Sequence, residues 1–218
     1  VPFDIPVYCI FEDHQGVIWL GSRGKGLFRL TRKPDNTFNV SNYQYNPDDI
    51  YSIGSNAVYS VYQDHLHRLW VATFGGGINR IDFAGNQLRF ISARNQLRNY
   101  PMDECAKTRY ITEDKNGYVY VGTTGGLIVF KADQKSAEDI SFRHFSHNPT
   151  SQSYLSGNDV QYILITRKGD VYLALFGGGI NRLRGGYQFN QTPCFEVFEK
   201  EKAPFCNVVY TLNEDEIG

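Results

Sequence analysis

An internal repeat of about 50 residues constrains the fold of this sequence more than any other feature. Anchor positions 13, 64, 114, 166 and 215 are spaced 51, 50, 52 and 49 residues apart. The repeat cores occupy residues 7–30, 58–81, 108–130 and 160–183, with a partial core at 207–218. This period is that of one four-stranded propeller blade. We predict an all-β chain in which residues 1–218 form four four-stranded β-propeller blades plus the start of a fifth, an incomplete arc of a larger, seven-bladed propeller.

Each unit contains apolar stretches that predict strands. In the second unit we expect strands at residues 58–62, 69–72, 77–81 and 88–92. Both alternating phases of the second strand are apolar or aromatic, as in Tyr118–Val121 of the third unit, which predicts a strand covered on both faces. A blade meets this condition because it packs between two neighbouring blades. One position of this strand carries Trp19, Trp70, Tyr120 and Tyr172, and we expect these side chains in the core.

The turn between the first and second strands has the pattern Asp-x-x-Gly, at Asp13, Asp114 and Asp215. An aspartate can accept hydrogen bonds from its own turn, and glycine tolerates a positive φ. We therefore interpret the anchor aspartates as turn residues rather than catalytic ones. Two units depart from the pattern, with His67 in place of glycine and Thr166 in place of aspartate.

A longer motif, I/V-x-x-D-x-x-G-x-I/L-W-I/L/V-G-T/S followed by G-G-G-L/I-x-R-L, resembles the two-component-regulator propeller repeat. The residues that carry it are Asp13, Gly16, Trp19, Gly21, Gly26, Leu27 and Arg29 in the first unit, and Asp64, Trp70, Thr73, Gly77, Ile78 and Arg80 in the second. The resemblance covers essentially the whole chain. It implies a periplasmic sensor region of a hybrid two-component protein that detects oligosaccharides, with the histidine kinase outside this chain.

On this interpretation the chain is not itself an enzyme and has no cofactor. Two other functions stay open from the sequence: a propeller enzyme that acts on polysaccharides, and an architectural propeller that binds no small molecule. Four blades and a fraction do not close a ring. We therefore expect the end blades to pack on the remaining blades of a larger protein or on a second copy of the chain.

Composition argues against other classes of partner. With 22 basic and 23 acidic residues the net charge is −1, which favours neither nucleic acid nor a direct contact with anionic membranes. No stretch approaches the roughly 20 apolar residues of a membrane span. Of the four cysteines, none is in a CxxC motif; they are either thiols or, for Cys194 and Cys206, a disulfide in an exported protein.

Neither glycine nor histidine motifs indicate a cofactor or metal. The segments Gly75–Gly77 and Gly177–Gly179 lead into strands, whereas a phosphate site needs the N-terminus of a helix. His65 and His67 lack an evident third metal ligand, so we expect no metal site there.

The loops that meet around the centre of a propeller provide the candidate ligand site. Turns between the second and third strands place Arg23, Phe74, Thr124 and Phe176 at one repeat position, and the loops between blades place Asn56, Asn158 and Asn207 at another. Aromatic rings and amides suit a sugar, which offers an apolar face and vicinal hydroxyls. The alternative is structural, since a repeated Phe can cover a neighbouring blade and a repeated Asn can cap a turn.

Overall fold

The computed structural model describes residues 4–148, 150, 154–198 and 207–216. Four antiparallel four-stranded sheets follow one another along the chain, which confirms the all-β propeller fold. Blades A and B contain β1 (Val7–Glu12), β2 (Ile18–Ser22), β3 (Leu27–Arg32), β4 (Phe38–Tyr43), β5 (Val58–Gln63), β6 (Leu69–Thr73), β7 (Gly77–Ala84) and β8 (Gln87–Ile91). Blades C and D contain β9 (Thr108–Glu113), β10 (Tyr118–Thr123), β11 (Gly126–Lys131), β12 (Arg143–Phe145), β13 (Asp159–Ile165), β14 (Val171–Phe176), β15 (Gly179–Leu183) and β16 (Phe195–Val197).

Two short helical turns lie in the loops, α1 (Met102–Cys105) and the 3-10 turn Ala137–Asp139. No helix in the described part of the chain is long and apolar enough to cross a bilayer. Residues 207–216 run beside β14, where the N–H of Val209 donates to the Leu175 carbonyl at 3.1 Å. The predicted pairing of Cys194 with Cys206 lies outside the described residues. Burial raises the pKa of Cys9 and of Cys105 to about 11, so both are protonated thiols at neutral pH.

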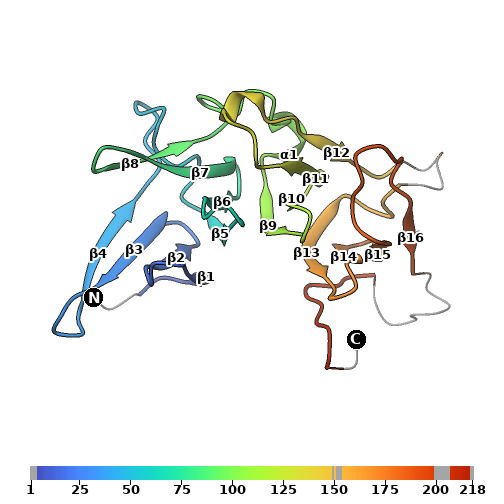
Figure 1. Cartoon of the computed structure of the whole chain (residues 1–218), viewed down its shortest axis with the longest axis horizontal. Helices are drawn as coiled ribbons and strands as arrows, with labels where there is room; N and C mark the ends of the chain where they lie inside the picture. The colour runs from blue at the N-terminus through green and yellow to red at the C-terminus, as the bar shows by residue number, and fades with distance from the viewer. Residues whose placement is uncertain (1–3, 149, 151–153, 199–206, 217–218) are drawn as a thin grey trace.

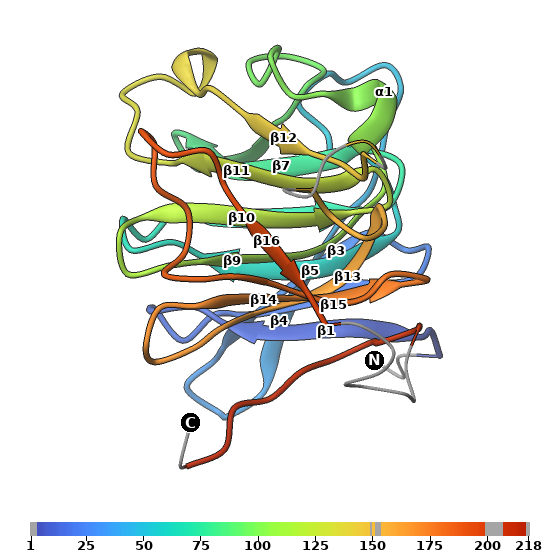
Figure 2. The same cartoon turned by 90° about the vertical axis from the view of Figure 1, so that its right-hand side faces the viewer.

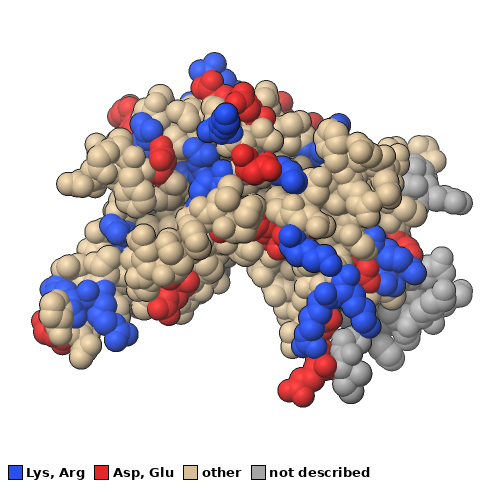
Figure 3. Space-filling view, viewed as in Figure 1, with Lys and Arg blue, Asp and Glu red and all other residues tan. Residues whose placement is uncertain are grey.

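The blades form an open arc (Figure 1). The first strand of every blade, β1, β5, β9 or β13, lies on the concave side, and the fourth, β4, β8, β12 or β16, lies on the outside. The strands run along the short axis of the arc, so that Figure 2 shows them lengthwise. Four inner strands therefore stand side by side along one concave wall, which the space-filling view shows as a hollow between the two ends of the arc (Figure 3).

The anchor aspartates hold the turns and the tryptophans together. Asp64 accepts main-chain N–H bonds from Leu66 and Arg68 through Oδ1, and Oδ2 accepts the indole N–H of Trp70 at 2.9 Å. Asp13 does the same for Trp19, and Asp114 accepts from the hydroxyl of Tyr120. A buried carboxylate with several fixed donors is a structural group, as the sequence indicated.

The second strands form the core. Trp19, Trp70 and Tyr120 are buried, which confirms this part of the prediction, whereas Tyr172 is only half-buried. Trp70 contacts Phe130 of the next blade edge-on, with ring centroids 5.1 Å apart. Tyr172 faces residues 207–216, and these do not form a complete sheet that would bury it.

A hydrogen bond repeats between neighbouring blades at the turns that follow the first strands. We call it the blade clamp: the main-chain N–H just after one anchor donates to the side chain just before the next anchor. The pairs are His14 with Gln63 at 2.9 Å, His65 with Glu113 at 2.8 Å, and Arg167 with Glu214 at 3.0 Å. The junction of blades C and D has Ile165 at the acceptor position, and its side chain cannot accept. The same junction has a two-fold hydrogen-bonded ion pair, Arg109 with Asp159, at the opposite end of its inner strands.

Candidate functional site

A β-bulge recurs at one position of every inner strand. The registers of β1, β5, β9 and β13 against their neighbours skip one residue near the start of each strand. The skipped residues are Tyr8, Tyr59, Arg109 and Gln161. A bulge re-aims the side chain of its extra residue and is often found beside functional sites. Four blades thus each present one re-aimed side chain at the same end of the concave wall.

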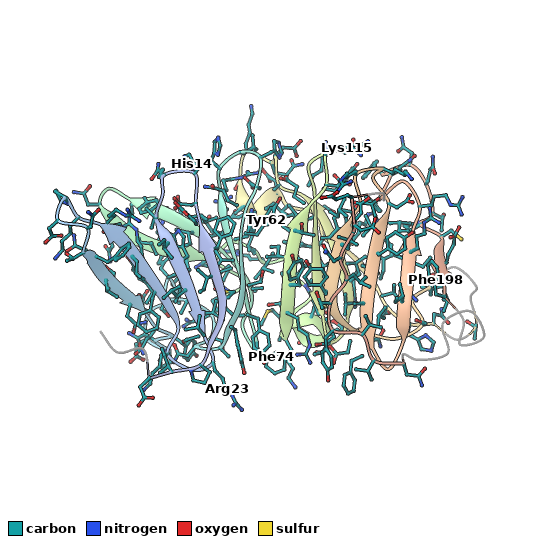
Figure 4. The ribbon with its side chains drawn as sticks, turned by 90° about the horizontal axis from the view of Figure 1, so that it is seen from below. His14, Arg23, Tyr62, Phe74, Lys115 and Phe198 are labelled. Atoms are coloured by element: carbon teal, nitrogen blue, oxygen red, sulfur yellow. The ribbon has the colours of Figure 1, made fainter. Side chains whose placement is uncertain are left out.

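Figure 4 views the molecule from the concave side and shows the two ends of the wall. His14 and Lys115 mark the end with the blade clamps, and Arg23 and Phe74 mark the opposite end. We call the second the Phe74 end; it is formed by the turns after β2, β6, β10 and β14 together with the bulges. The loops between blades reach the same end, since Phe74 forms a bridge with Lys107 and Phe176 with Val208.

The structure brings the predicted turn residues to the Phe74 end in different states of exposure. Arg23 is exposed and Phe176 is 50% exposed, whereas Phe74 and Thr124 are half-buried. The ring of Phe176 lies 6.3 Å from that of Tyr210, on the segment after blade D. The aromatic positions therefore both touch the neighbouring repeat and remain partly open to solvent.

The predicted asparagines reach this end as well, where the side-chain amides of Asn56 and Asn158 and the main chain of Asn207 hold the chain. The Asn56 Oδ1 accepts the main-chain N–H of Tyr45 at 2.7 Å, and the Asn158 Oδ1 accepts that of His147 at 2.6 Å. The main-chain carbonyl of Asn207 accepts the main-chain N–H of Gly179 at 3.2 Å. These contacts match the turn-capping interpretation, and they leave the aromatic and charged residues as the exposed chemistry of the Phe74 end.

Aromatic rings from blades A and B form a continuous surface here. The ring centroids of Tyr8 and Tyr59 are 4.5 Å apart, and Tyr59 stacks on Phe74 at 5.3 Å. The guanidinium carbon of Arg109, from blade C, lies 5.3 Å from the centre of the Phe74 ring. Burial raises the pKa of Tyr59, and the adjacent Tyr8 hydroxyl adds to the rise. The Tyr59 hydroxyl is therefore protonated at neutral pH and can donate a hydrogen bond.

An ion pair continues the surface into blade D. Arg109 donates from Nε and Nη2 to the two carboxylate oxygens of Asp159 at 2.7 and 3.0 Å. Gln161 Nε2 also donates to Asp159, at 2.8 Å. The carboxylate holds the guanidinium against the Phe74 ring and leaves the Gln161 amide beside it. The result is a cluster of aromatic rings bordered by fixed polar groups, which suits ligand binding.

The sequence reasoning missed the bulged residues. They differ in type from blade to blade, and their position in an apolar strand suggested only packing. The available signal was the repeat register: Tyr8, Tyr59 and Arg109 are the second residues of their strands and Gln161 is the third, at a place where each inner strand changes its alternation.

Residues 2–24 and 52–75 match the model of the two-component regulator propeller family. No curated protein matches the sequence. The chain is similar to the extracellular domain of a protein from B. thetaiotaomicron described as a hybrid two-component system, with 26% identity and a TM-score of 0.61 over 85% of this chain and 22% of that one. A second such domain from the same organism has 25% identity and a TM-score of 0.61, over 83% of this chain and 24% of that one.

The chain thus spans about a quarter of the length of these two domains. It is also similar to virginiamycin B lyase from Staphylococcus aureus, with 16% identity and a TM-score of 0.56 over 93% of this chain and 59% of that one. At this identity the likeness to the lyase shows the fold alone. The match to the family model falls in the first two units, whose anchors, tryptophans and turns are the ones described above. Residues 2–24 and 52–75 thus carry two-component regulator propeller repeats, and the later units share their four-stranded blade.

Proposed function

We propose that the chain is part of the extracytoplasmic, periplasmic ligand-sensing region of a hybrid two-component signalling protein, and that its ligand is an oligosaccharide bound at the Phe74 end. The observation that carries the proposal is the set of four matching bulges, which turn Tyr8, Tyr59, Arg109 and Gln161 towards one place. On this proposal the chain binds and does not catalyse, and the kinase activity belongs to another part of the protein.

Sugar chemistry fits this surface. A pyranose ring has an apolar face that stacks on an aromatic ring, and hydroxyls at its edge that pair with amides and guanidinium groups. Tyr59 and Phe74 supply the rings, and Arg109 and Gln161 supply donors that are held by Asp159. Exposed Arg23 and Phe176 extend the surface towards both ends of the arc.

Replacing Phe74 by alanine is expected to weaken oligosaccharide binding by about tenfold, or about 1.4 kcal/mol. The stacking surface for the sugar would be lost, together with the ring that supports Arg109. The measurement is titration calorimetry of the intact sensor protein against a panel of oligosaccharides. Phe38→Ala is the matched control, because Phe38 also has an arginine, Arg32, over its ring but lies on the rim of blade A.

Three results would contradict the proposal. Unchanged affinity in Phe74→Ala, Arg23→Ala and Phe176→Ala, with the fold intact, would move the site elsewhere. Release of shorter sugars during incubation would indicate a polysaccharide-acting enzyme. Binding of no member of the panel would favour an architectural propeller.

The proposal includes a further blade packed on β1, from the remainder of the protein or from a second copy. Ile10 is 72% exposed, whereas Val61, Ile111 and Ile163 at the same repeat position are 6%, 1% and 2% exposed. Exposed Glu12 occupies the acceptor position of the blade clamp. A face that is buried in three blades and open in the fourth fits one more blade of the same kind, whose turn N–H would donate to Glu12.

We therefore expect residues 1–218, when expressed alone, to self-associate through this face. Ile10→Lys should reduce the association by placing a charge on the apolar surface. Light scattering over a dilution series measures the effect, and Ile50→Lys serves as control, because Ile50 is also exposed but lies in the loop before β5. A dilution-resistant monomer that binds no hydrophobic dye would contradict the expectation.

A further inference from the structure

A pocket of about 320 Å³ lies between the outer parts of blades C and D. Tyr118, Lys131, Gln134 and Arg143 line it from blade C, and Tyr187 and Phe189 line it from the loop between β15 and β16. The Phe74 end is instead built from the inner strands and the turns after the second strands. The pocket is therefore separate from the surface assigned to oligosaccharide sensing, and binding at the pocket does not depend on that function.

Hydrogen bonds to buried core residues hold the Tyr187 side of this pocket in place. The main-chain N–H of Tyr187 donates to the Tyr120 hydroxyl at 2.7 Å, and that hydroxyl donates to Asp114 at 2.9 Å. Blades A and B have Trp19 and Trp70 at the position of Tyr120, and an indole N–H donates but cannot accept. Tyrosine at position 120 thus provides the acceptor that ties the blade D loop to blade C.

Aromatic packing completes this attachment. The buried Tyr187 ring meets Tyr118 edge-on, with centroids 5.0 Å apart. Phe189 lies two residues later and is 66% exposed. An aromatic side chain so open to solvent, on a loop that is anchored just before it, provides a stacking surface at the mouth of the pocket.

Two cations border the aromatic surface. The Lys131 Nζ lies 5.3 Å from the centre of the Tyr118 ring, and the guanidinium carbon of Arg143 lies 5.8 Å from that of Phe189. Lys131 also lies 3.6 Å from the Asp133 carboxylate, but both side chains are more than 40% exposed, so this pair is weak. Within the described residues, Arg143 has no carboxylate partner. The pocket therefore combines an apolar ring surface with unneutralised positive charge.

We propose that this pocket binds a uronic acid unit of an acidic saccharide. Its ring would stack on Phe189, its carboxylate would meet Arg143 and Lys131, and its hydroxyls would meet the amide of Gln134 and the hydroxyl of Ser141. The volume lies near the lower bound for small-ligand sites and suits one or two sugar rings. Neutral sugars would leave Arg143 without a carboxylate and Lys131 with only its weak pair to Asp133, so the site selects for the carboxylate.

The test is calorimetry of the intact protein with digalacturonic acid, using galactobiose as the neutral counterpart. We expect digalacturonic acid to bind and galactobiose to bind at least tenfold more weakly. Arg143→Gln and Phe189→Ala should each weaken the binding of digalacturonic acid by about tenfold or more. Both side chains are exposed, so neither change should disturb folding. Arg32→Gln is the matched control, since Arg32 lies over Phe38 at 5.7 Å on blade A.

Other outcomes would overturn the proposal. Equal affinity for the two disaccharides would show that the carboxylate does not contribute to binding. Unchanged affinity in both pocket variants would show that the sugar does not bind in this pocket. Competition by benzoate at the same strength would show a site for any ring-bearing carboxylate rather than for a sugar. If Phe74→Ala abolished binding of digalacturonic acid while Arg143→Gln had no effect, the acidic sugar would occupy the Phe74 end.

Discussion

Replacing Trp70 by alanine is expected to lower the free energy of unfolding by about 3–5 kcal/mol, the range for deleting a buried aromatic side chain. Trp70 is completely buried, packs on Phe130 of the next blade and donates its indole N–H to Asp64. The change would leave a cavity between blades B and C and would remove one of the two donors to the buried Oδ2 of Asp64. Both effects lower the free energy of unfolding.

Chemical denaturation followed by circular dichroism measures this loss. Trp70→Tyr is the matched control, because Tyr120 already performs the same task in blade C through a hydroxyl that donates to Asp114. It should cost clearly less than the alanine variant. If Trp70→Ala kept its melting temperature but lost ligand binding, Trp70 would be a site residue and its assignment to the core would be wrong.

Replacing Asp64 by alanine is expected to cost about 3 kcal/mol, because it leaves buried donors without an acceptor. Asp64 accepts from two main-chain N–H groups, from the indole of Trp70 and from Nε of Arg68. The Arg68 guanidinium, one of whose buried nitrogens has no hydrogen-bond partner among the described residues, would also lose its carboxylate.

Asp35 offers the comparison for this measurement. It accepts from the main chain and hydroxyl of Thr37 in an exposed hairpin, so Asp35→Ala removes a similar turn contact without a buried partner. The unfolding midpoint of the Asp35→Ala variant should be close to that of the unsubstituted protein. Equal losses for the two variants would mean that the turn, and not the buried network, accounts for the effect of Asp64.

The repeat was enough to predict the propeller because blade packing depends on few positions. Asp64 and Trp70 recur at fixed spacing, and their spacing follows from one turn and one strand. The candidate site was harder to predict from the sequence. Bulges depend on the pairing of two strands, and the sequence of one strand does not reveal where a partner skips a residue. Tyr59 and Arg109 therefore looked like ordinary strand residues.

Features outside the repeat were also beyond sequence reasoning. The segment from Gly185 to Phe189 has no counterpart in the other units, so no register predicts that it crosses to blade C. The role of Asn56 was left open between binding and capping for a related reason. An amide suits both, and its contact with the main chain of Tyr45, which fits capping, could not be foreseen from the sequence.

The blade clamp makes the arc a linear series of separate joints. Each clamp joins two positions, such as His65 on one blade and Glu113 on the next, and adds to the core packing between the same two blades, such as that of Trp70 on Phe130. Stability in such an array is a sum of unit terms and nearest-neighbour couplings. Whole units can therefore be gained or lost during evolution while the remaining joints keep their fit. At the junction of blades C and D, Ile165 occupies the acceptor position, and an ion pair links the two blades at the opposite end of the wall.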